Sequence, residues 1–134
     1  MAIDCADPER LARFWTDVLG YRLREPPAGH ASWSAYSLAV GTRPDEAWTM
    51  IVDPEGDGPS VLFHKVPEAK VVKNRVHLDV FLAPGEPVEA RRPLVAPEVA
   101  RLVGLGATYV RTDDDGEDYY AVLQDPEGNE FCVG

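Results

Sequence analysis

The sequence predicts an α+β fold in which two tandem βαβββ modules form one partly closed, curved sheet. The turn Asp53-Pro54-Glu55-Gly56 returns 72 residues later as Asp125-Pro126-Glu127-Gly128, and in each half a helix that ends at glycine comes before the turn and a strand follows it. Elements that recur in the same order indicate an internal repeat. We therefore expect one domain over residues 1–134, with modules at about residues 1–67 and 74–134.

The first helix has clear signals at both ends. Asp7 is a favourable N-cap, and Pro8 suits the first helical position. Gly20 is expected to end the helix in a left-handed conformation. Between them, apolar residues recur at the spacing of one helix face, namely Leu11, Phe14, Trp15, Val18 and Leu19.

Strands are expected to complete the first module. Aromatic and β-branched residues are concentrated at residues 21–24, 33–40 and 48–52, with Pro, Gly and Asp between them. We predict three consecutive antiparallel strands there and a closing strand at residues 61–66. Residues 67–73 are interpreted as a linker.

The second module is expected to open with a strand over residues 75–82, where apolar and polar residues alternate. Asp79 is expected to point away from the face that carries His77. Four prolines within residues 83–97 predict a loop with at most a short helical turn, followed by a helix from Pro97 to Gly104 or Gly106.

The last part of the chain is predicted to form three strands, at residues 108–111, 119–124 and 130–133. The acidic residues 113–116 are interpreted as a turn between the first two of them. Both modules then have the order strand, helix, glycine and three strands.

Composition excludes several classes of function. The formal charge of −10 argues against a nucleic-acid partner, which requires clustered Lys and Arg. No apolar run approaches the roughly 20 residues that span a bilayer, so we expect no membrane partner and a cytoplasmic location. Cys5 and Cys132 lie near opposite ends of the sequence, and we interpret both as thiols.

Several segments carry a family resemblance. The motif Lys-Asn-Arg-Val-His-Leu-Asp at residues 73–79 and the motif Asp-Pro-Glu-Gly-Asn-Glu-Phe-Cys at residues 125–132 are its most specific parts, together with residues 7–15, 18–21 and 105–108. The chain resembles the vicinal oxygen chelate superfamily of glyoxalase I, bleomycin-resistance proteins and extradiol dioxygenases, and within it the glyoxalase-like subgroup. The resemblance implies the glyoxalase/bleomycin resistance/dioxygenase fold and a homodimer.

The resemblance also implies positions for metal ligands. Metalloenzymes of the superfamily use two ligands in each half, on the opening and closing strands. Here the second opening position falls on His77, and the closing positions fall on His64 and Cys132, where the family usually has Glu. The first opening position falls at or just before Ala2, which cannot bind metal. Without either Glu, authentic glyoxalase I activity is not expected.

Two interpretations of these residues stay open. His64, His77 and Cys132 could converge on a divalent ion such as zinc and leave a coordination position for substrate. In the alternative, His77 hydrogen-bonds within a metal-free cleft, His64 lies near the surface and Cys132 is a small buried apolar residue.

Aromatic side chains could line a ligand cleft, although aromatic residues on strands are more often part of a core. The candidates are Trp33, Trp48, Phe63 and Tyr120. Glu130 shares a strand face with Cys132 and is a weak candidate for acid–base catalysis.

These features support two hypotheses for function. In the first, the protein binds a small apolar or aromatic ligand in a cleft with a degenerate metal site. In the second, it is an enzyme, either a metal-assisted lyase, isomerase or dioxygenase-like enzyme or a metal-free dehydratase-type enzyme that acts on a small metabolite.

Overall fold

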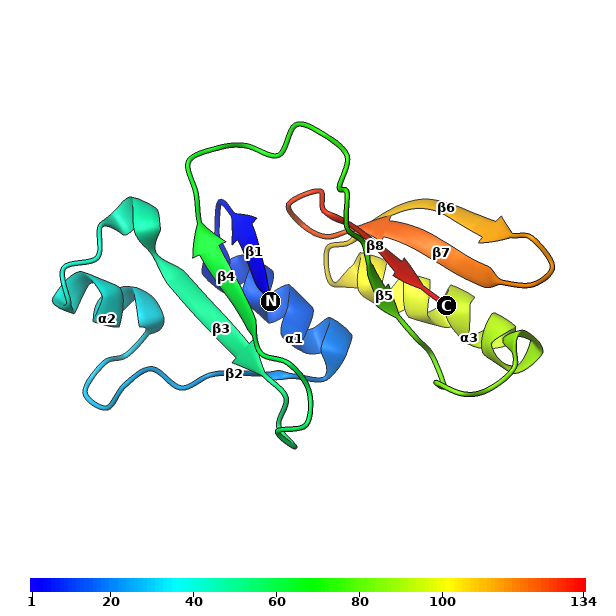
Figure 1. Cartoon of the computed structure of the whole chain (residues 1–134), viewed down its shortest axis with the longest axis horizontal. Helices are drawn as coiled ribbons and strands as arrows, with labels where there is room; N and C mark the ends of the chain where they lie inside the picture. Colours follow the sequence, from blue (N-terminus) through cyan, green and yellow to red (C-terminus); the bar gives the residue numbers. More distant parts are fainter. The chain divides into compact units, whose positions relative to one another are not determined.

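The computed structural model describes the backbone of residues 1–134 and every side chain except that of Pro44. It divides into two compact units, Met1–Ala69 and Lys70–Gly134 (Figure 1). The first unit contains β1 (Ala2–Cys5), α1 (Pro8–Leu19), β2 (Arg22–Leu23), α2 (Trp33–Ala39), the short 3-10 helix η1 (Pro44–Glu46), β3 (Trp48–Val52) and β4 (Val61–Lys65). The second contains β5 (Leu78–Val80), α3 (Val88–Gly104), β6 (Thr108–Asp114), β7 (Tyr119–Gln124) and β8 (Glu130–Val133).

The two units share one topology. Each has a four-stranded sheet, with the order β1-β4-β3-β2 in the first and β5-β8-β7-β6 in the second. In each sheet the opening and closing strands are parallel, and the other neighbours are antiparallel. The predicted α+β class and the tandem βαβββ modules are therefore confirmed. The first unit differs by the insertion of α2 and η1 between β2 and β3.

Helix α1 forms as the sequence predicts. The Asp7 side chain accepts a hydrogen bond from the backbone N–H of Arg10 at 3.1 Å, and Gly20 ends the helix at φ +68°. Its apolar face packs on β3 and β4 and includes the fully buried Leu11. Burial of this face is the main stabilising contribution, since short helices are marginal in isolation.

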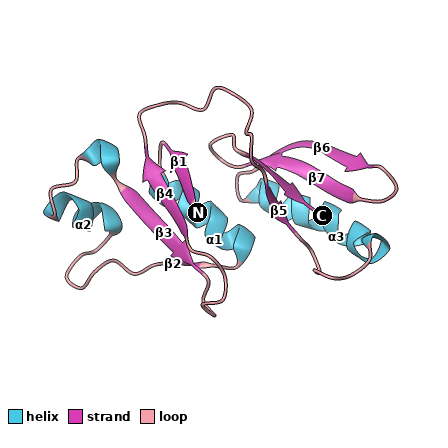
Figure 2. Cartoon of the chain, viewed as in Figure 1, coloured by secondary structure: helices cyan, strands magenta, loops and turns pink.

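The prediction of a strand at residues 33–40 is wrong, because most of this segment is helix α2 (Figure 2). Ser32 is the N-cap, and its hydroxyl accepts a hydrogen bond from the backbone N–H of Ala35 at 3.0 Å. Trp33 is buried, and its indole N–H donates to the carbonyl of Arg24 at 2.6 Å. The aromatic residues that indicated a strand instead anchor the start of a helix.

The prediction of a proline-rich loop up to Pro97 is also wrong, since α3 already begins at Val88. Proline within a helix removes one backbone hydrogen bond and crowds the carbonyl four residues earlier. Here Pro93 and Pro97 lie inside the helix, while Val95 and Leu102 are buried and α3 packs against β7. Tertiary burial therefore outweighs the local cost of the two prolines.

The strand limits differ from the prediction in the second unit. The opening strand β5 covers only Leu78–Val80, and the exposed Val76 and Phe81 lie outside it. Strand β6 extends to Asp114, so Asp113 and Asp114 belong to the strand and only the residues after them turn. The predicted limits of β3, β7 and β8 are confirmed. No helix among the described residues has the length and apolar character needed to cross a membrane.

The repeated turn has the same structure in both units. Asp53 follows β3 and accepts backbone hydrogen bonds from Glu55 at 3.0 Å and Gly58 at 2.7 Å, which lower the pKa of its carboxyl group. Asp125 follows β7 and accepts backbone hydrogen bonds from Glu127 at 2.9 Å and Asn129 at 3.0 Å. Each aspartate thus closes the turn that directs the chain into the closing strand.

We expect Asp125→Ala to destabilise the protein more than the matched control Asp53→Ala. Asp125 is only 2% exposed, so its loss leaves several donors without an acceptor in a buried place. The cost should be at least about 2 kcal/mol. Denaturant unfolding of both variants measures the difference, and equal losses of stability would contradict the importance of burial here.

Candidate functional site

Helix α1 packs on one face of the first sheet and α3 packs on one face of the second. We term the opposite face of each sheet its helix-free face, although Trp33 of α2 contacts Trp48 at the border of that face in the first unit. In the first unit, the buried Ile51, Val61 and Phe63 share the side of α1, while the alternate residues Trp48 and His64 are half-buried. In the second unit, the buried Phe131 and Val133 alternate with the half-buried Glu130 and Cys132. The sequence-predicted polar residues therefore lie on the helix-free faces.

A chain of polar contacts crosses the helix-free face of the second sheet. The ammonium of Lys73 lies 2.8 Å from Nε2 of His77, and Nδ1 of the same ring lies 3.9 Å from Sγ of Cys132. Asp79 is paired with Cys132 in the β5–β8 register. The structure thus brings two predicted residues, His77 and Cys132, into contact.

The lysine determines the tautomer of the histidine. A charged lysine can only donate a hydrogen bond, so Nε2 of His77 must accept it. The ring proton of the neutral imidazole then lies on Nδ1, which faces Cys132. Because the lone pair at Nε2 is already occupied by Lys73, His77 has no free ring nitrogen to offer another donor.

Cys132 is held as a thiol. Burial, followed by the negative charge of Asp79 and the hydrogen bond that the thiol makes with it, raises the pKa of Cys132 to about 11. The prediction that Asp79 points away from His77 is therefore wrong, since both side chains act on the same sulfur atom. His77 directly precedes β5 and Asp79 lies on it, and a spacing of two residues in extended backbone directs both side chains to one side.

Tyr120 adjoins this cluster on β7. The negative charge of Asp113 is the main cause of the raised pKa of the Tyr120 phenol, and Cys132 also contributes. Asp113 in turn accepts a hydrogen bond from Nε of Arg111 at 2.9 Å. At neutral pH the phenol therefore remains protonated beside the thiol.

Glu130 is a structural anchor in this arrangement. Its carboxylate accepts the backbone N–H of Asn74 at 2.9 Å and lies 3.6 Å from Nζ of Lys70. Burial raises its pKa, but the Asn74 hydrogen bond and the charges of Lys70 and Lys73 more than offset this, so the net pKa is lowered. A carboxylate with a lowered pKa is a poor proton donor at neutral pH.

His64 belongs to the first unit, where its Nδ1 lies 3.7 Å from the carboxylate of Asp4. The β1–β4 register pairs Asp4 with His64 in the same way as the β5–β8 register pairs Asp79 with Cys132. His64 and Cys132 therefore occupy equivalent positions in the repeat. By the same register, Ala2 is the counterpart of His77.

The predicted aromatic residues fall into two groups. Trp33 is buried on α2 and stacks on Trp48, with ring centroids 4.3 Å apart. Phe63 is 0% exposed and belongs to the core. Trp48 and Tyr120 are partly exposed, and a ligand could contact them without opening the core.

The donor set does not fit a metal ion as it is arranged. No group of three or more His, Cys, Asp or Glu side chains that could hold an ion occurs among the described residues. The two neighbouring donors are a thiol with a raised pKa and a histidine engaged by a lysine, whereas metal ligands must be deprotonated.

Sequence reasoning missed Lys73, Asp79 and Asp113 as members of this cluster. The sequence predicts a linker that includes Lys73 and a turn at the acidic residues 113–116. Their roles depend on which strands become neighbours, and the spacing along the sequence gives no signal for that. The alternation within β5 could have identified Asp79.

Comparison with known proteins identifies one protein family whose model matches the chain and many solved structures that resemble it. Residues 1–134 match the family model for the glyoxalase-like domain. No curated protein matches the chain significantly.

The solved structures that resemble the chain are distant in sequence. A glyoxalase/bleomycin resistance protein/dioxygenase family enzyme from Burkholderia phytofirmans PsJN has a TM-score of 0.62 and 19% identity, and the match covers 99% of this chain and 93% of that one. A glyoxalase-related enzyme from Fulvimarina pelagi has a TM-score of 0.60 and 17% identity, with coverage of 99% and 83%. A mutant fosfomycin resistance protein, FosX, from Listeria monocytogenes in complex with Mn(II) and 1S,2S-dihydroxypropylphosphonic acid has a TM-score of 0.64 and 10% identity, with coverage of 98% and 85%.

We expect alkylation of Cys132 by iodoacetamide to be slow at about pH 8.5, where a thiol with a pKa near 11 is roughly 0.3% ionised. The rate should rise about tenfold per pH unit up to about pH 11. Asp79→Asn removes a negative charge, so it should lower the pKa and accelerate the reaction at pH 8.5. Peptide mapping by mass spectrometry separates Cys132 from Cys5, and a rate that levels off near pH 9 in the unsubstituted protein would contradict the raised pKa.

Proposed function

Because the chain belongs to the glyoxalase-like domain family, we propose that it binds a small molecule on the helix-free face of its second sheet, with a metal site that has degenerated. The ligand would contact Tyr120 and Cys132 on the helix-free face of the second unit. These side chains are partly exposed and lie on strands, which hold them in fixed positions.

The observation that carries this proposal is the contact between Lys73 and His77. The ammonium occupies the lone pair of Nε2, and its positive charge beside the imidazole would repel a divalent cation bound at either ring nitrogen. The raised pKa of Cys132 acts in the same direction, because proton loss from the thiol would be an added cost of metal binding. Together they favour ligand binding without a metal.

The Mn(II) complex of the Listeria FosX provides a contrast in chemistry. Manganese prefers oxygen ligands such as carboxylates. The equivalent positions of the repeat carry His64 and Cys132 here, so the closing strands supply no carboxylate at those two places. We therefore do not extend the chemistry of that complex to this chain.

The ligand we propose is apolar or aromatic, with a polar substituent. The ring of Tyr120 offers an aromatic surface, and its phenol hydroxyl and the ammonium of Lys73 offer polar groups. A homodimer, as the family resemblance implies, forms part of the same proposal.

A metal-dependent lyase, isomerase or dioxygenase-like enzyme is the second candidate. It is favoured by one distance, the 3.9 Å between Nδ1 of His77 and Sγ of Cys132. That spacing is close to the separation of roughly 3.5 Å expected for two ligands of one tetrahedral zinc ion. For this candidate, the ring of His77 and the thiol would have to lose their present partners.

Ligand binding can be tested by thermal shift with a panel of aromatic and apolar carboxylic acids, alcohols and amides. A ligand at 100 times its dissociation constant should add about 2.7 kcal/mol of stability and raise the Tm by several degrees. Tyr120→Ala should remove most of this shift. Tyr109→Ala is the matched control, since Tyr109 on β6 is paired with Leu123, whose buried side chain belongs to the helix-covered face. Equal shifts in the two variants would contradict the proposed location.

Metal content distinguishes the two candidates. We expect the protein, purified without an affinity tag, to contain far less than one equivalent of any transition metal, and His77→Ala to leave that amount unchanged. His30→Ala serves as the control, because His30 makes an edge-to-face contact with Tyr36 in the first unit. About one equivalent of metal that is lost in His77→Ala and retained in His30→Ala would establish the metal-dependent candidate instead.

A further inference from the structure

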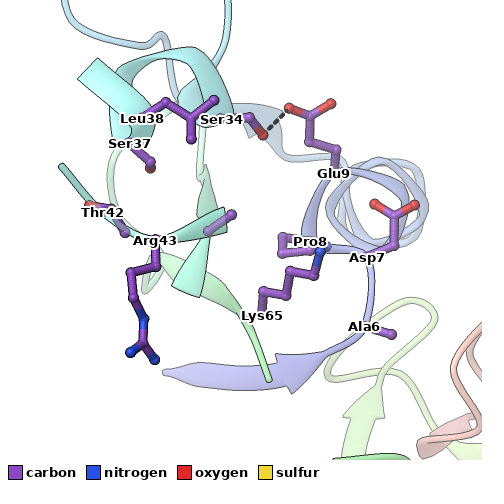
Figure 3. Close-up of a pocket in the computed structure, with 11 residues that line it drawn as sticks. Ala6, Asp7, Pro8, Glu9, Ser34, Ser37, Leu38, Thr42, Arg43 and Lys65 are labelled. Atoms are coloured by element: carbon purple, nitrogen blue, oxygen red, sulfur yellow. Dashed lines mark hydrogen bonds between the residues drawn. The ribbon is translucent and has the colours of Figure 1, made fainter. Parts of the chain in front are cut away.

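A pocket of about 370 Å³ lies entirely within the first unit (Figure 3). Its walls come from the start of α1, one face of α2, the segment before η1 and the end of β4. The volume is within the range of sites that hold small metabolites. None of the residues discussed above as site candidates lines this pocket, so it is distinct from the proposed helix-free site.

The first observation that points to a ligand is the buried hydroxyl of Ser37 on α2, which has no hydrogen-bond partner among the described atoms. The Ser37 side chain is on the pocket wall and only 2% exposed. The backbone carbonyl of the same residue is satisfied, since it accepts the N–H of Thr42 at 2.8 Å. A buried hydroxyl without a partner costs free energy, and a ligand acceptor that reached it would remove this cost.

The second observation is the ammonium of Lys65, at the end of β4, which has no salt-bridge partner among the described side chains. Lys65 is half-buried. Figure 3 shows its side chain extending along the pocket toward Pro8. Arg43, the other cation on the wall, is already paired with Asp45 at 3.3 Å and Glu46 at 3.1 Å. The pocket wall therefore carries one ammonium without a salt-bridge partner and one hydroxyl without a hydrogen-bond partner within the described part of the chain, and both groups can donate to a carboxylate.

The pocket also contains two carboxylates, which limit the kind of anion it can accept. Asp7 caps α1, and Glu9 accepts a hydrogen bond from the hydroxyl of Ser34 at 3.0 Å (Figure 3). Both would repel a dianion such as phosphate. A ligand that carries its own positive charge would instead be attracted to Glu9 while its carboxylate meets Lys65.

We propose that this pocket binds a small zwitterion of the amino-acid type. Its carboxylate is held by the ammonium of Lys65 and the hydroxyl of Ser37, and its ammonium by the carboxylate of Glu9. Acidic and basic groups come from α1 and β4, two different walls of the pocket, so a molecule with separated charges fits better than a simple anion. This assignment does not depend on the function proposed for the helix-free face of the second sheet.

The test is a titration of the ¹⁵N-labelled protein with L-alanine, L-glutamine and L-phenylalanine, followed by backbone amide shifts. At least one of them should bind saturably, with the largest shifts in α2 and at the end of β4. Propanoate and ethylamine are the two half-molecules of L-alanine, and 3-phenylpropanoate and 2-phenylethylamine are those of L-phenylalanine. Each half-molecule should bind at least tenfold more weakly than its parent.

Two substitutions give the matching result on the protein side. Lys65→Met should weaken binding about tenfold or more, because a charged hydrogen bond is lost. Arg75→Met is the control, since it makes the same change in net charge at an exposed position of the second unit. Ser37→Ala should weaken binding about threefold without lowering the Tm, because it removes a hydroxyl that has no partner in the free protein.

Three results would overturn the proposal. One is the absence of saturable binding by all three amino acids, and another is binding that Lys65→Met and Ser37→Ala leave unchanged. The third is binding of propanoate or 3-phenylpropanoate as tightly as the parent amino acid, which would show that no zwitterion is selected.

Discussion

The position of every candidate residue on the sheets depends on the burial of two phenylalanines. Phe63 on β4 and Phe131 on β8 are both fully buried, on the sides of their sheets that α1 and α3 cover. Because successive strand residues point to opposite faces, His64 and Cys132 must then lie on the helix-free faces. A shift of one residue in either strand would bury the polar side chain and expose the phenylalanine, so the register is strongly specified.

The chemistry of the helix-free face in the second unit follows from which charges are neighbours there. Burial and the negative charge of Asp79 keep Cys132 protonated, and Lys73 occupies the one lone pair that His77 has to offer. Each of these groups satisfies another, so the cluster is a hydrogen-bonded network rather than a set of free ligands. A cluster of this kind is suited to holding polar groups of a small molecule in a defined orientation.

The two modules have the same topology but differ in content. Both use an aspartate to close the turn before the last strand, yet Asp125 is buried whereas Asp53 is partly exposed. Only the first unit contains α2 and η1, and this insertion supplies a wall of the pocket that Ser37 and Lys65 line. The repeat thus preserves the backbone framework, while an insertion in one copy creates a separate concave surface.

The sequence by itself determined the features that depend on local chemistry: the repeat, helix α1 with its Asp7 cap, and the limits of β3, β7 and β8. It also placed Cys132 on a strand, whereas His77, which the sequence predicts on a strand as well, lies directly before β5. Only the tertiary structure decided where burial outweighs local preference. Aromatic residues at 33–40 form a helix because Trp33 packs into the core, and α3 continues through Pro93 because its apolar side chains are buried against β7. The partners of His77 and Cys132 were likewise decided by strand pairing, which brings together residues that are far apart along the chain.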